Sequence, residues 1–402
     1  MRHQTVTDLR RNNRARVLRH VLLATGSTSR SEIARHCRLS AATAATVVAD
    51  LIEEGLVTES GTVPSDGGRP TARLIPVAGS AYMLGVDVGE AGVTIELFDL
   101  DLRRHDRVFV DVPAAEASPA STGAALTEAV DTIRGQNRSV ESLILGVGLG
   151  LPGIVSLDKG TPVVHAQSMG WVATPVASLL PDCDIPVYAE NGAKTLALAE
   201  VWTGAAKGVQ NGIVALIGRG LGVGITTHGR SFRGATSSAG EWGHTKISVG
   251  GPTCRCGARG CLEAYIGGDA IVRRWLESEP VDVPKSYGEA LDLLLRRADD
   301  GDEVAVRCVD EAVTVLSIGL ANLVNLYNPE QVVIGGWAGL SLFAAREKQI
   351  DFEVRQQSLA QPAADLRIVA AQLGGDGVAL GAALLPVEQL IDIGVRRSRQ
   401  RI

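Results

Sequence analysis

The sequence lacks any long run of apolar residues. Of its 402 residues 45% are apolar, yet no stretch approaches the roughly 18 to 20 uninterrupted apolar residues that a membrane-spanning helix needs. Residues 1–16 are rich in arginine and contain no apolar segment of the kind found in signal peptides. We therefore expect a cytoplasmic protein with no membrane contact.

Cysteine is also scarce. Six cysteines are too few for a disulfide scaffold in a chain of 402 residues. Cys37, Cys183 and Cys308 are isolated among apolar neighbours, a pattern typical of small buried side chains. The other three lie within eight residues, from Cys254 to Cys261, and require a separate explanation.

Lysine is absent from residues 1–73. This segment holds 11 arginines against 7 acidic residues and so carries a net charge of +4, whereas the whole chain carries −6. The remainder must then carry −10. A basic N-terminal module joined to an acidic body favours a nucleic-acid partner for the module alone.

The basic module has the pattern of a winged helix-turn-helix. Apolar residues at 17, 18, 21 and 22 indicate a first helix, a capping box opens a second at Ser29, and a third runs from Ser40 to Gly55. Residues 56–58 and 71–75 then predict a β-hairpin wing. A plain helical bundle with a solvated arginine face is the alternative. The candidate DNA-binding residues are Arg30, Ser40, Ala41, Thr43 and Thr46, with Arg69 at the tip of the wing.

From residue 82 onward, apolar strands bounded by glycine alternate with helical segments, which predicts an α/β body. Strands are expected near 84–89, 93–100, 142–150, 185–188 and 213–217, and helices near 121–136 and 193–204. Glycines at 218, 220, 222 and 224 allow either an anion to approach the backbone or close packing of a strand.

A metal site is indicated by His244, Cys254, Cys256 and Cys261. Three thiolates and one imidazole form a tetrahedral ligand set for Zn²⁺, and because the protein fills all four positions the metal should be structural. Three reduced cysteines near a chance histidine are the alternative. Two carboxylates, Glu241 and Glu263, flank the loop, where they could accept hydrogen bonds from vicinal sugar hydroxyls or simply be solvated.

Together these motifs resemble the ROK family, which comprises sugar-responsive repressors and sugar kinases. The resemblance is strongest over residues 239–244 and 254–265, and it extends to Leu151-Pro152-Gly153, Asn328-Pro329-Glu330 and residues 334–336. It implies a two-lobed α/β body with an actin/hexokinase-like (ribonuclease H-like) fold, a structural Zn²⁺, and a homodimer or homotetramer. The domains expected are 1–78 for the winged helix, 79–195 plus 385–402 for the smaller lobe, and 196–384 for the larger lobe with the zinc loop and the oligomerisation surface.

The resemblance also implies a loss of catalysis. Kinase members of the family hold phosphates in an Asp-x-Gly-Gly-Thr loop and a Gly-Thr-Gly-x-Gly loop, and their general base is an Asp directly after the sugar-site Asn. Here Glu90 and Ala91 follow Gly89, Arg219 takes the threonine position of the second loop, and Gly192 follows Asn191. We expect no ATP cofactor and no enzyme activity, with vestigial nucleotide loops at Asp87, Gly89, Gly220, Gly222, Gly335 and Gly336.

The sugar-binding positions implied by the resemblance are Gly153, Asn191, Glu241, His244 and Glu263, although Gly192 and Ser168 depart from the family pattern. The sequence thus predicts a repressor of carbohydrate-metabolism genes that binds a double-stranded DNA operator, lies on the nucleoid when bound, and responds to a sugar or sugar-derived effector between its lobes. Two alternatives remain open. One is an ATP-dependent sugar kinase; the other is a regulator controlled by a partner protein, with a vestigial cleft and a basic end at 396–401.

Overall fold

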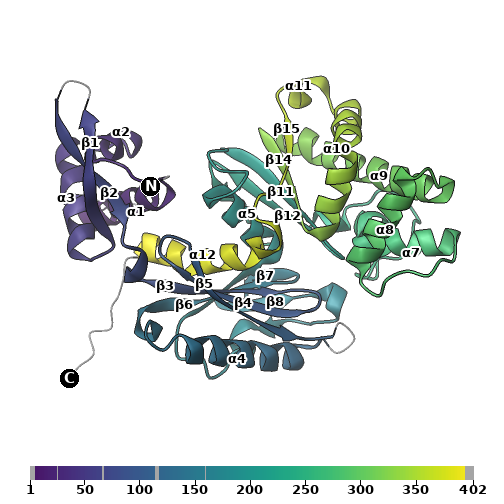
Figure 1. Cartoon of the computed structure of the whole chain (residues 1–402), viewed down its shortest axis with the longest axis horizontal. Helices are drawn as coiled ribbons and strands as arrows, with labels where there is room; N and C mark the ends of the chain where they lie inside the picture. Colours follow the sequence, from purple (N-terminus) through teal and green to yellow (C-terminus); the bar gives the residue numbers. More distant parts are fainter. Residues whose placement is uncertain (1–4, 25, 66–67, 114–116, 159, 394–402) are drawn as a thin grey trace.

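An N-terminal helical unit precedes two α/β lobes in the computed structural model, which describes residues 5–24, 26–65, 68–113, 117–158 and 160–393 (Figure 1). The unit consists of α1 (Val6–Leu23), α2 (Arg30–His36), α3 (Ala41–Glu53) and the antiparallel hairpin of β1 (Val57–Ser65) and β2 (Gly68–Pro76). Three helices followed by a hairpin are the elements of a winged helix-turn-helix.

Side-chain caps set the starts of these three helices. Thr5 and Ser29 each form a capping box with the residue three positions later, and the Ser40 hydroxyl accepts a hydrogen bond from the Thr43 amide at 3.1 Å. Each cap satisfies amides that the first turn of a helix leaves unpaired. The second and third helices therefore begin at the caps that the sequence predicts, Ser29 and Ser40.

The smaller lobe is built on a five-stranded sheet in the order β10-β6-β3-β4-β5. The β3, β4 and β5 strands are antiparallel neighbours, whereas β6 and β10 run parallel to β3. Helix α4 (Pro119–Gln136) covers one face of the sheet (Figure 1). The strands are β3 (Tyr82–Val88), β4 (Gly92–Asp99), β5 (Arg104–Asp111), β6 (Ile144–Leu151) and β10 (Val187–Asn191), with a separate three-stranded sheet of β7 (Ile154–Asp158), β8 (Thr161–His165) and β9 (Thr174–Pro175).

The larger lobe repeats this topology. Its sheet has the order β13-β12-β11-β14-β15, again with three antiparallel strands followed by two parallel ones. The strands are β11 (Asn211–Ile217), β12 (Leu221–Thr227), β13 (Arg230–Ser231), β14 (Gln331–Gly335) and β15 (Arg367–Ala370). The helices are α5 (Gly192–Trp202), α6 (Glu263–Ile266), α7 (Gly268–Ser278), α8 (Tyr287–Asp299), α9 (Glu303–Tyr327), α10 (Trp337–Gln357) and α11 (Ala360–Ala363). The prediction of a two-lobed α/β body is confirmed.

Helix α12 (Gly377–Ile393) lies on the face of the small-lobe sheet opposite α4, and one of its ends is near the winged-helix unit (Figure 1). It spans both sides of the domain boundary proposed at 384/385, just as α5 spans the one proposed at 195/196. Both boundaries remain proposals. Within the described residues, no helix combines the length and the apolar character needed to cross a membrane.

Candidate metal centre and sugar cleft

The loop between β13 and α6 brings His244, Cys254, Cys256 and Cys261 together, and their ligand atoms all lie within 4.8 Å of one another. Cys256 Sγ is 3.8 Å from Cys261 Sγ, and His244 Nδ1 is 3.7 Å from Cys254 Sγ. Tetrahedral ligands at zinc–sulfur distances of about 2.3 Å stand about 3.8 Å apart. The four residues therefore fit a bound metal ion in both donor chemistry and spacing.

Lys246 supplies a counter-charge to this cluster. Its Nζ lies 2.8 Å from Cys261 Sγ. Three thiolates around a divalent cation leave one negative charge in excess, which a neighbouring ammonium offsets. Gly260 allows the loop to close, because at φ +73° a Cβ would lie 1.8 Å from the Ser248 carbonyl oxygen.

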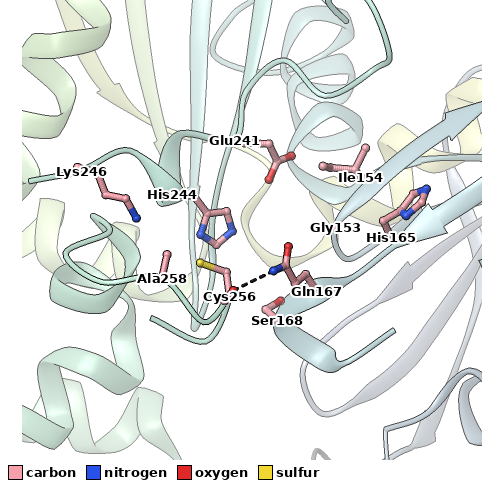
Figure 2. A pocket seen from close by; sticks show the side chains of 10 residues that line it. All are labelled: Gly153, Ile154, His165, Gln167, Ser168, Glu241, His244, Lys246, Cys256 and Ala258. Atoms are coloured by element: carbon pink, nitrogen blue, oxygen red, sulfur yellow. Dashed lines mark hydrogen bonds between the residues drawn. The ribbon is translucent and has the colours of Figure 1, made fainter. Parts of the chain in front are cut away.

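A cavity of about 390 Å³ opens beside the cluster, between the two lobes (Figure 2). The smaller lobe contributes the β7–β8 region and the turn that follows it, and the larger lobe contributes the metal loop. Gln167 Nε2 donates across the cavity to the Cys256 carbonyl oxygen at 2.9 Å, so one lobe holds the metal loop of the other. The lining residues are Gly153, Ile154, His165, Gln167, Ser168, Glu241, His244, Lys246, Cys256 and Ala258.

Asn191 fixes the smaller-lobe side of the site. Its Nδ2 donates to the Gly153 carbonyl oxygen at 2.7 Å, while its Oδ1 caps α5 by accepting from the Ala193 amide at 2.9 Å. Gly153 is required at φ +78°, because a Cβ there would lie 2.2 Å from the His165 carbonyl oxygen. Two of the predicted sugar-binding residues are thus in direct contact.

The carboxylates of Glu241 and Glu263 occupy different environments. Burial raises the pKa of Glu241, and Glu263 adds to the rise, whereas His244 and Lys194 lower it. Glu263 is buried and accepts from the Leu221 amide at 3.0 Å, with Arg255 Nη2 3.5 Å from its Oε1. Glu263 is therefore already engaged within the protein, and Glu241, which lines the cavity, is the more available acceptor.

The first residue of α5 is Gly192, the position at which the resemblance implies the general base of a kinase. A Cβ built there would meet nothing closer than 3.8 Å. A Cβ therefore fits at this position without a steric clash.

Glu90 reaches from the β3–β4 turn to the other lobe. Its Oε1 accepts from the Arg219 amide at 2.5 Å, and Trp337 Nε1 is 3.4 Å from its Oε2. Desolvation raises the pKa of this solvent-accessible carboxyl group, while the Arg219 amide opposes the rise. A carboxylate thus already binds the backbone of the second glycine loop.

Nearby on β3, burial together with the negative charges of Glu90 and Glu96 raises the pKa of Asp87 to about 7.

The other predicted nucleotide-loop glycines mainly permit close packing. A Cβ at Gly222 would lie 2.7 Å from Ala193 Cβ, and one at Gly335 would lie 3.0 Å from Leu196 Cδ2, both on α5. Gly336, at φ +79°, approaches the Ile217 carbonyl oxygen. Gly220 lies beside Glu263, and Gly89 closes the β3–β4 turn by donating to the Gly92 carbonyl oxygen. Of the two interpretations, strand packing is thus favoured for Gly222.

On the winged-helix unit, the contact residues predicted near the start of α3 lie on its accessible side: Ser40, Ala41 and Thr46 are exposed, and Thr43 is half-buried. Arg30 instead forms an ion pair with Glu59 of β1 at 2.7 Å. The Arg69 side chain lies outside the part of the chain that the structure describes. Arg38, which is not among the residues predicted to contact DNA, is also exposed, in the α2–α3 turn with φ 48°.

Comparison with known proteins places this geometry in a family. The model of the ROK family matches residues 83–389. The chain belongs to the ROK family. The xylose repressor of Caldicellulosiruptor bescii is 28% identical over 96% of this chain and 98% of its own, and a glucokinase of Halalkalibacterium halodurans is 33% identical over 77% of this chain and 96% of its own. A solved ROK family transcriptional regulator, a homologue of the E. coli MLC protein, has a TM-score of 0.78 at 26% identity and covers 96% of this chain and 97% of its own.

The fold expected from the resemblance is thereby confirmed. The xylose repressor matches nearly the whole chain, whereas the glucokinase matches 77% of it. The unmatched part is about as long as the winged-helix unit. The Cys/His cluster of this ROK protein could bind a metal ion.

Proposed function

We propose that this ROK protein is a DNA-binding transcriptional repressor of carbohydrate-metabolism genes whose operator affinity is set by a sugar or sugar-derived effector in the cleft. The observation that carries the proposal is the union, in one chain, of a winged helix-turn-helix with a ROK body that has Gly192 after Asn191. The full-length match to the xylose repressor supports it. Zn²⁺ in the Cys/His cluster would be structural, since the protein fills all four positions.

The proposal is tested by selecting duplexes from a random DNA library with the full-length protein. The expected product is a palindromic sequence, because a symmetric dimer presents two winged helices related by a two-fold axis. Release of that duplex by D-xylose or another sugar would support effector control. Failure to enrich any duplex would contradict the proposal, and sugar-dependent formation of ADP with phosphorylation of the sugar would favour the kinase alternative. Release only by a co-purified protein would favour the partner-controlled alternative.

For the DNA interface, we predict that Arg38→Ala weakens binding to all duplexes about equally. A guanidinium in the turn before α3 is placed for phosphate and not for base contact, and losing one phosphate contact lowers the slope of log K against log salt by about 1. Mobility-shift titrations at several salt concentrations measure both effects. Arg273→Ala, on α7 of the body and also exposed, is the control. An unchanged salt slope in Arg38→Ala would contradict the assignment.

For the effector site, we predict that Glu241→Gln weakens sugar binding about fivefold, because a charge-assisted hydrogen bond to a hydroxyl is replaced by a neutral one worth about 1 kcal/mol less. Calorimetric titration with D-xylose and D-glucose measures the change, and metal analysis checks that the cluster is retained. Glu277→Gln, on the exposed side of α7, is the control. Equal sugar affinity in both variants would exclude Glu241 from the site.

A further inference from the structure

Glu388 of α12 contacts side chains from two other helices, α1 and α5. Arg19 of α1 donates to both of its carboxylate oxygens, with Nη1 2.5 Å from Oε1. Trp202, the last residue of α5, donates from Nε1 to the same Oε1 at 3.2 Å. The Arg19 guanidinium also lies over the Trp202 ring, 5.7 Å from its centroid. One carboxylate therefore joins the winged-helix unit to both helices beneath it.

The winged-helix unit is not loosely attached at this point. Val17 and Leu18 of α1 belong to the same buried apolar cluster as Leu384 and Ile391 of α12. The Arg14 guanidinium adds a hydrogen bond to the Leu390 carbonyl oxygen at 3.1 Å. Because side chains packed in a common core move together, the orientation of α1 follows that of α12.

Helix α5 connects this contact to the cleft. It begins at the Asn191 cap, which holds the Gly153 carbonyl oxygen, and it ends at Trp202. A helix of 11 residues is about 16 Å long. The helix is buried along most of this length, so a displacement at its first turn is carried to its last.

The contact between α5 and α12 is also one of the contacts between the lobes. Helix α12 packs closely on the small-lobe sheet, where a Cβ at Gly148 would lie 1.8 Å from the Ala382 carbonyl oxygen. Helix α5 packs on the large-lobe sheet, where a Cβ at Gly224 would lie 2.3 Å from Ala197 Cβ. Between the two helices, a Cβ at Gly381 would lie 1.8 Å from the Thr195 carbonyl oxygen. A change in the angle between the lobes must therefore shift α5 relative to α12.

We propose that Arg19, Glu388 and Trp202 are positioning residues that transmit the state of the cleft to the DNA-binding unit. The inference rests on the proposed function. A ligand that prefers one arrangement of the lobes shifts α5 against α12, and α1 follows because Arg19 contacts both helices. The coupling requires only that the ligand bind the two arrangements with different affinity.

The test uses Glu388→Gln in the full-length protein, because an amide keeps the shape of the side chain and removes the charge. The operator selected above is titrated with and without D-xylose or D-glucose. We expect the ratio of the two operator Kd values to fall at least fivefold toward 1, while the sugar Kd measured without DNA stays within about twofold. Glu311→Gln is the matched control, since Glu311 pairs with Arg274 between helices of the larger lobe at 2.8 Å. An unchanged ratio in Glu388→Gln would overturn the inference.

A second measurement needs neither sugar. Asn191→Ala perturbs the start of α5, and its effect on operator affinity is compared in the native and the Glu388→Gln backgrounds. We expect the effect to shrink at least threefold in the second background; strictly additive effects would overturn the inference. If no duplex is selected, the proposed function fails. The coupling is then measured by hydrogen exchange of the α1 amides in the native protein, Asn191→Ala, Glu388→Gln and the double variant. Additive effects of the two substitutions on the exchange rates would again overturn the inference.

Discussion

Replacing Cys256 with serine is expected to release the metal and to lower the stability of the larger lobe by about 3 kcal/mol or more, or about 10 °C in the unfolding midpoint. Binding of a structural metal contributes directly to folding free energy, because the unfolded chain offers no preformed site. A serine hydroxyl is a poor substitute for a thiolate on a soft or borderline cation. Metal analysis of the purified variant, followed by calorimetry, measures both effects.

Cys183→Ser is the matched control, because Cys183 is half-buried and lies outside the Cys/His cluster. That variant should keep one metal ion per chain and nearly the native unfolding midpoint. A stoichiometric metal ion in Cys256→Ser would contradict the proposed ligand set.

Loss of the metal should also weaken sugar binding, since the Cys256 carbonyl oxygen accepts the hydrogen bond that Gln167 donates across the cavity.

The metal cluster could be predicted from sequence because its residues lie close together in the chain. His244 and Cys261 are joined by a short loop, so spacing and residue type alone bring the ligand atoms within range. Helix starts were equally accessible, because a cap such as Ser29 acts on its own first turn. These features depend on local interactions, which the sequence displays directly.

Contacts between distant segments could not be predicted in this way. Arg30 carries the charge expected of a DNA contact, but the hairpin places Glu59 beside it. The glycine pattern around Gly222 is typical of a phosphate-binding loop, yet in the fold Gly222 packs closely against Ala193 of α5. The pairing of Arg19 with Glu388 joins residues near the two ends of the sequence, and only the packing of α1 on α12 reveals it.

The second large expected effect concerns sugar-kinase chemistry. Gly192→Asp should be accommodated, since a Cβ at this position would meet nothing closer than 3.8 Å and an acidic residue in the first turn of a helix is favourable by about 0.5 kcal/mol. We nevertheless expect no sugar-dependent ATP turnover from this variant. Glu90 still accepts the Arg219 amide, so a negative charge remains where the phosphates of a nucleotide would approach.

Turnover should rise only when the base position and the first loop are both restored. Gly192→Asp combined with Glu90→Gly and Ala91→Thr restores the base and frees the first loop, and a correctly placed general base is worth about 10²- to 10⁴-fold in rate. A coupled assay for ADP formation with D-glucose and D-xylose compares the single, double and triple variants. Turnover by the native protein or by Gly192→Asp alone would contradict this account, because it would mean that the Glu90 carboxylate yields its position to the nucleotide. If instead Glu90→Gly with Ala91→Thr binds ATP without turning it over, the two defects are separable, and the native protein lacks both the phosphate site and the base.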